Sequence, residues 1–264
     1  MDIIQRNFLR LLRAGAFGEY EQTEPMSEWK WKRLYQTSQI HGVTPWIADG
    51  IRLGDGDFFL QQISPALREK FYADNTERYE EFKQEHLTNP LLNRKLKQLT
   101  GERNGGPTLD LLLSLVGIAR NILTQGVSLR HLIMLGTYLR TTHDAIDYEK
   151  LKEWTTNLGL ERMARLEGSL LVELFHFTPD EIRFTDAAGD KDSRQVVSDI
   201  FKLTQKNAAE WYFTQGRSIF VRTNDSDAMM WHVKLSAKYM RYYPSEALTN
   251  FMANFAHSLS HIEE

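Results

Sequence analysis

The residues best placed to bind an anion are Ser128, Arg130 and His131, at the expected start of a helix. A helix N-terminus offers unpaired backbone N–H groups, and an arginine guanidinium can hold a phosphate or carboxylate through two parallel hydrogen bonds. The three residues are therefore a candidate nucleotide or anion site. A structural interpretation is also open, in which Ser128 only caps the helix and Arg130 pairs with Asp144 or Asp147.

Metal chemistry has one pair of candidate ligands, His257 and His261, spaced four residues apart near the end of the chain. That spacing puts two imidazoles on one helix face, where they could hold zinc or nickel. No HExxH motif accompanies them, so ordinary surface histidines are the favoured interpretation. Asp186, Asp190 and Asp192 lack the ligand rhythm of an EF-hand. We predict no metal site and no cofactor.

Nucleophilic and phosphate-loop chemistry also lack a sequence signal. The chain has no cysteine, and its other histidines are dispersed. The glycine-rich stretches at 54–57 and 105–107 lack the lysine and the strand–helix context of a phosphate-binding loop. We therefore assign no catalytic residue.

Composition narrows the class of protein and of partner. The 264 residues carry a net charge of −3, with no clustering that favours general binding to nucleic acid or to an anionic membrane. The apolar run at 109–123 is too short to span a bilayer and contains Asp110, Arg120 and Asn121. The N-terminus lacks the pattern of a secretory signal. We expect a soluble cytoplasmic protein that does not contact a membrane.

The elements that position these residues are all expected to be helices. Apolar residues recur every three or four positions along most of the chain, and no convincing strand series occurs. We predict an all-α bundle of about ten helices around a buried helical hairpin at residues 108–140. In that hairpin Thr108 is the expected N-cap, Gly126 the left-handed end of the first helix and Ser128 the cap of the second.

Two regions are expected on either side of the polar loop at 100–107. Residues 1–100 form an N-terminal helical region with a long helix at 65–100, which Pro90 either kinks or restarts. Residues 107–264 form a C-terminal helical region, and the two together make two domains or one continuous domain. In the first helix, Asp2 and Gly15 are the expected start and end signals. Its arginines are expected to form a solvated face: Arg6, Arg10 and Arg13.

Three segments resemble a family of bacterial nucleotidyltransferases found widely in Bacteroidetes. Residues 7–51, NFLRLLRAGAFGEYEQTEPMSEWKWKRLYQTSQIHGVTPWIADGI, are similar to the family's N-terminal helical region. Residues 126–175 are similar to its C-terminal helical region, with the turn GVSLR, the acidic cap IDYEKL and the junction LGL. The tail YYPSEAL at 242–248 is also similar. The resemblance implies helical flanking regions in the family's order.

The same resemblance implies a missing catalytic module. In the family, a KG pair, an arginine and a DxD carboxylate pair stand between the two helical regions and would hold two metal ions at the nucleotide phosphates. Here residues 93–107 run almost directly from one region to the other, and Asp55 and Asp57 lie in a glycine-rich loop. We expect a non-catalytic relative that binds an unknown protein partner or forms a homodimer. The alternatives are a nucleotide- or anion-binding protein, or a nucleotidyltransferase with an unrecognised active site.

Overall fold

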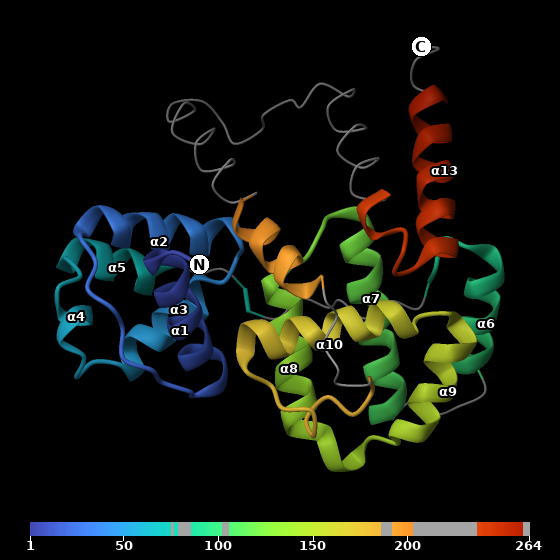
Figure 1. Cartoon of the computed structure of the whole chain (residues 1–264), viewed down its shortest axis with the longest axis horizontal. Coiled ribbons are helices and arrows are strands. Elements are labelled where there is room, and N and C mark those ends of the chain that lie inside the picture. Colours follow the sequence, from blue (N-terminus) through green and yellow to red (C-terminus); the bar gives the residue numbers. More distant parts are fainter. Residues whose placement is uncertain (75–76, 79–85, 102–105, 186–191, 203–236, 261–264) are drawn as a thin grey trace. The chain divides into compact units, whose positions relative to one another are not determined.

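The computed structural model describes the chain except for residues 75–76, 79–85, 102–105, 186–191, 203–236 and 261–264, and describes only the backbone of residues 254–260 (Figure 1). Every regular element in the described part is a helix, and no strand occurs there, which confirms the all-α prediction. Contacts divide the chain into two compact units. Unit 1 contains Met1–Glu80, Glu173–His176 and Asp192–Arg217, and unit 2 contains the remainder.

This division does not follow the expected boundary at 100–107. Unit 1 ends first at Glu80, and two later segments of the chain return to it. The last turn of α10 (Glu161–Phe175) belongs to unit 1. There the guanidinium of Arg13 donates a hydrogen bond to the backbone carbonyl of Leu174 (3.2 Å), and the rings of Phe17 and Phe175 meet edge to face. A contact between residues 161 positions apart leaves no signal in local composition.

Unit 1 is built on helices α1 (Ile3–Phe17), α2 (Glu28–Ile40), α3 (Thr44–Leu53), α4 (Phe58–Gln61) and α5 (Pro65–Ala73), together with a helical stretch at 193–202. Its core is aromatic and aliphatic. The fully buried side chains include Phe8, Leu11, Leu12, Trp31, Leu34, Ile47, Ile51, Leu60 and Phe71.

Glycines set the distance between α1 and α3. A Cβ built on Gly15 would lie 1.7 Å from the carbonyl oxygen of Trp46, and one on Gly50 would lie 2.1 Å from the carbonyl oxygen of Leu11. Any side chain at either position would therefore push the two backbones apart. Gly15 does not end α1, as its type suggested. The helix runs on to Phe17 and ends at Gly18, which adopts a left-handed conformation (φ 74°).

The helix expected at 65–100 is not continuous. Helix α5 ends at Ala73, Asp74 is extended, and α6 runs from Pro90 to Gly101. Proline lacks the N–H that a continuing helix needs and disfavours helical backbone in the residue before it. Asn89 takes that place and caps α6, its side-chain oxygen accepting from the amides of Leu91 (3.1 Å) and Leu92 (3.2 Å). Pro90 therefore starts a new helix rather than kinking an old one.

Unit 2 contains α6 and the predicted hairpin, formed by α7 (Pro107–Thr124) and α8 (Leu129–Thr142). A short 3₁₀ turn (His143–Ala145), α9 (Tyr148–Leu158), most of α10 and α13 (Pro244–Ser260) complete the described elements. Gly126 is left-handed (φ 94°), as predicted. Thr108 is not the N-cap, because α7 already begins at Pro107. Its hydroxyl accepts instead from the amide of Asp147 (2.9 Å), joining the starts of α7 and α9.

Helix α7 is the hydrophobic centre of unit 2. By length and composition alone its 18 residues could cross a bilayer, but 72% of this window is buried inside the protein. Burial on several sides explains a helix that is apolar nearly all round.

Candidate functional site

The structure brings Ser128, Arg130 and His131 together at the start of α8. The Ser128 hydroxyl accepts from the backbone amide of His131 (3.4 Å), so the predicted cap is formed and occupies one of the amides available to an anion. The His131 side chain is buried and Arg130 is half-buried. Asp147, one of the two suggested partners of Arg130, caps α9 by accepting from the amide of Lys150 (3.0 Å). Anion binding at this turn stays a prediction.

The metal candidates fall largely outside the described residues. His261, Asp186 and Asp190 are not described, and of His257 only the backbone in α13 is. Within the part of the chain that is described, no three His, Asp or Glu side chains gather where they could hold a metal ion.

The arginines of α1 form the expected solvated face only in part, because Arg6 is exposed, Arg10 is half-buried and Arg13 is buried, and all three pair with carboxylates. Arg6 and Arg10 donate to the carboxylate of Glu24 (2.7 Å each), and Arg13 donates to that of Glu21 (2.6 Å). Hydrogen bonding from Arg6 lowers the pKa of Glu24 to about 2. Both glutamates lie in segment 18–27, which has no regular secondary structure and which the arginines thereby bind to α1.

Buried Asn7 completes this attachment through the backbone. Its side-chain amide donates to the carbonyl of Glu24 (2.8 Å), and its side-chain oxygen accepts from the amide of the same residue (2.9 Å). The Asn7 side chain thus pairs with both the backbone N–H and the backbone carbonyl of one residue, as a neighbouring β-strand would do with its own backbone. Segment 18–27 is thus held along its length without regular structure.

Asp57 fixes the turn between α3 and α4. The carboxylate accepts from the hydroxyl of Tyr20 (2.6 Å), the amide and hydroxyl of Thr23 (2.8 Å each) and the amide of Phe59 (2.8 Å). Burial would raise its pKa, but these hydrogen bonds outweigh burial and lower it. The sequence placed Asp57 in a flexible glycine-rich loop, whereas the structure makes it the anchor between that loop and segment 18–27.

Large side chains are exposed around this anchored turn. Phe58 is 65% exposed and Leu53 is 54% exposed, and Tyr20 and Tyr72 are each 36% exposed. Tyr20 packs against Gly54, where an added Cβ would meet its ring at 2.3 Å, and the guanidinium of Arg52 lies 4.5 Å above the centre of the Tyr72 ring. We call the following residues the aromatic patch: Tyr20, Arg52, Leu53, Phe58 and Tyr72.

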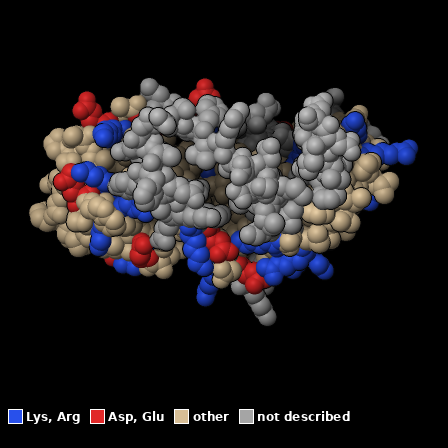
Figure 2. Space-filling view, turned by 90° about the horizontal axis from the view of Figure 1, so that it is seen from above, with Lys and Arg blue, Asp and Glu red and all other residues tan. Residues whose placement is uncertain are grey.

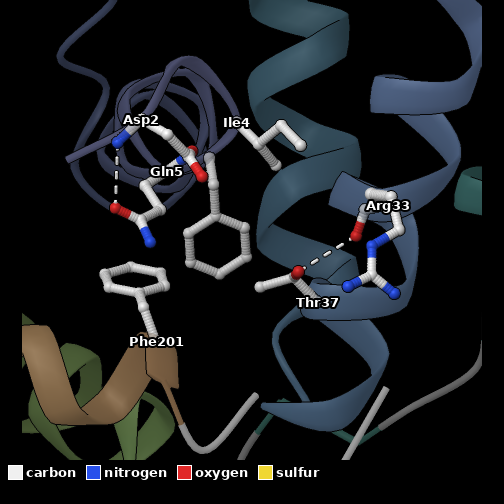
Figure 3. Close-up of a pocket in the computed structure, with 7 residues that line it drawn as sticks. Asp2, Ile4, Gln5, Arg33, Thr37 and Phe201 are labelled. Atoms are coloured by element: carbon white, nitrogen blue, oxygen red, sulfur yellow. Dashed lines mark hydrogen bonds between the residues drawn. The ribbon is translucent and has the colours of Figure 1, made fainter. Parts of the chain in front are cut away.

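A small pocket in unit 1 lies between α1, α2 and the helical stretch at 193–202 (Figure 3). Asp2, Gln5, Arg33, Thr37 and Phe201 are among its lining residues. Its volume of about 40 Å³ suits a few water molecules, far below the roughly 300 Å³ at which ligand pockets begin. Several polar atoms of the pocket already make hydrogen bonds within the helices. Asp2 and Gln5 form the capping box of α1, and the Thr37 hydroxyl donates to the carbonyl of Arg33 (2.9 Å). This pocket is too small for a nucleotide.

Glu167 of α10 is an unusual ionisable group within the described part of unit 2. Its side chain is fully buried, and neither carboxyl oxygen has a hydrogen-bond partner. Removal from water raises its pKa well above the ordinary value, because a charge has no compensating contact there. Burial therefore favours the protonated, neutral form of Glu167 over the carboxylate.

Charge is mixed over the face shown in Figure 2, where blue Lys and Arg side chains lie beside red Asp and Glu side chains in the described regions.

Comparison with known proteins adds no relative. No protein-family model matches the chain, and searches among curated proteins and solved structures found no match either. The likeness to nucleotidyltransferases therefore remains an expectation drawn from the sequence.

Proposed function

We propose that this chain is a non-catalytic helical protein that acts by binding a protein partner through the aromatic patch. The observation that supports this most directly is the exposure of Phe58 and Leu53 on either side of one anchored turn. Burying a side chain of this size against a partner contributes about 1.5–3 kcal/mol, so two neighbouring ones can anchor an interface. Tyrosine and arginine, which also belong to the patch, are enriched at such anchor points.

The anchoring of the turn supports the same proposal. The four hydrogen bonds to Asp57, and the packing of Tyr20 on Gly54, hold the patch in place before any partner arrives. A surface that is already ordered loses little conformational entropy on binding, and more of the contact energy therefore appears as affinity. Arg52 also pairs with Asp49 (2.6 Å), which fixes its position over the Tyr72 ring.

In this proposal the chain is a cytoplasmic relative of nucleotidyltransferases that kept the helical regions and lost the module between them. The described charges fit a structural role. Arg6, Arg10 and Arg13 hold segment 18–27, Asp57 holds a turn, and Asp147 caps a helix.

Site-specific photo-crosslinking in cells of the native host tests the proposal. The photoreactive amino acid benzoylphenylalanine replaces Phe58. In a matched control it replaces Leu91, which is 74% exposed on α6 and does not belong to the aromatic patch. We expect position 58 to give one discrete heavier adduct that the additional change Leu53→Ser removes. Equal adducts from positions 58 and 91, or an adduct that survives Leu53→Ser, would contradict the proposal.

A further inference from the structure

One side of α13 is firmly attached to unit 2. The carboxylate of Glu246, which is fully buried, accepts from the amides of Thr88 (2.6 Å) and Asn89 (2.8 Å) at the start of α6. Asn250 accepts from the Thr88 hydroxyl (2.6 Å), and the hydroxyl of Tyr243 donates to the carbonyl of Leu158 (3.1 Å). Residues 243, 246 and 250 therefore define the inward face of the helix.

The other side of α13 exposes large apolar side chains. Leu248 is 51% exposed and Met252 is 62% exposed, and their spacing of four residues puts them on one face. In the sequence, Phe255 and Leu259 follow at the same spacing seven residues later. The pattern i, i+4, i+7, i+11 is typical of a helix that buries a stripe against another helix. Figure 1 shows the later turns of α13 extending beyond α6 and α7 of the same unit.

The charges along α13 suit a pairing between identical surfaces. From Ala247 to Ser260 the helix contains no lysine, arginine, aspartate or glutamate. In a two-fold symmetric contact the same patch stands on both sides, so any charge on it meets like charge nearby. An uncharged apolar stripe avoids this repulsion entirely. A partner recognised by charge would have nothing to pair with here.

We propose that α13 packs antiparallel against the α13 of a second copy of this chain, through the face that carries Leu248 and Met252. The 17-residue helix is about 25 Å long, so a single helix pair lies at or below the lower limit of specific interfaces, roughly 1,200 Å² in total. The dimer is therefore weak and reversible, with a Kd in the micromolar range or above. It uses a different unit from the aromatic patch and does not depend on that proposal.

Sedimentation velocity of the full chain, from about 1 µM to about 100 µM, measures the association over the expected Kd range. We expect the wild type to move from monomer to dimer, Met252→Glu to stay monomeric, and the control Leu91→Glu to behave as the wild type. Circular dichroism checks that both variants keep their helix content. A wild type that is monomeric at the highest concentration, or a Met252→Glu variant that dimerises equally well, would overturn the proposal.

Cysteine cross-linking tests the geometry, because the chain has no cysteine of its own. Near a two-fold axis a residue meets its own copy, and a disulfide needs two Cα atoms within about 7 Å. We expect Met252→Cys to form a covalent dimer on mild oxidation much faster than Leu91→Cys. Equal rates for the two variants would mean that α13 does not face its own copy.

Discussion

Replacing Glu167 with glutamine tests whether an unpaired buried carboxyl makes the protein less stable as pH rises. In the folded state both oxygens lack a partner, and the pKa of the carboxyl is raised well above its ordinary value. In the unfolded chain it returns to about 4.3. Below that pH both states hold the proton, and Glu167 leaves stability unchanged. Above it only the unfolded chain releases the proton, so the free energy of unfolding falls until pH reaches the folded-state pKa.

The size of the effect follows from one proton. Between the two pKa values each pH unit changes the unfolding equilibrium tenfold, or about 1.4 kcal/mol. Glutamine keeps the shape but cannot ionise. The difference in stability between Glu167→Gln and wild type should therefore grow in favour of the variant by about this amount for each unit from about pH 5 up to the folded-state pKa of Glu167.

Urea unfolding at a series of pH values, followed by circular dichroism, measures this difference. Glu153 is an exposed residue of the same unit, so Glu153→Gln is the matched control and should parallel the wild type. Glu167→Met, which removes the polar atoms, should be more stable than wild type at pH 7. Parallel curves for wild type and Glu167→Gln would refute the reasoning, because they would mean that the buried carboxyl keeps an ordinary pKa.

Three further predictions concern unit 1 and the anion site. Gly50→Ala should destabilise the fold by about 1–3 kcal/mol or more, because the added methyl meets the backbone of α1, whereas Gly56→Ala, with open space around it, should stay within about 0.5 kcal/mol in denaturant titrations. Asp57→Ala should cost about 2–4 kcal/mol by the same assay through its four lost hydrogen bonds, and the exposed control Asp55→Ala almost nothing; equal losses would contradict the anchor role. In a thermal-shift assay, a panel of nucleotides with and without Mg²⁺ should not stabilise the protein. A nucleotide that binds with a Kd of about 1 µM, present at about 100 µM, would raise the free energy of unfolding by roughly 2.7 kcal/mol. Such a shift would favour the alternative of a nucleotide site at the hairpin turn.

The fold could be predicted wherever the cause is local. Apolar periodicity predicted the all-α class and the hairpin, and short polar side chains beside helix starts identified the caps Asp2 and Ser128, which form as expected. The failures are long-range. Gly15 has the residue type of a helix end, but it serves as a contact point for α3. Thr108 has the residue type of an N-cap, but it bonds to the start of α9.

The candidate site was harder to predict for the same reason. Asp57 follows a Gly-Asp-Gly sequence that is typical of a flexible loop, and only the fold brings Tyr20 and Thr23 to its carboxylate. The exposure of Phe58 could not be predicted from the sequence either, because phenylalanine is usually a buried core residue. One feature of the sequence could have indicated its role. Asp57 stands directly before Phe58 and Phe59, which is where an N-cap residue stands before a helix, and it does cap α4.

The most direct test of the aromatic patch is calorimetric titration of the partner captured at position 58 with wild type, Phe58→Ala and the exposed control Leu91→Ala. A central anchor residue contributes about 2 kcal/mol or more, so we predict that Phe58→Ala raises the Kd by about 30-fold and that Leu91→Ala leaves it unchanged. A Kd for Phe58→Ala equal to that of the wild type would contradict the central claim, because it would mean that the partner binds elsewhere on the chain.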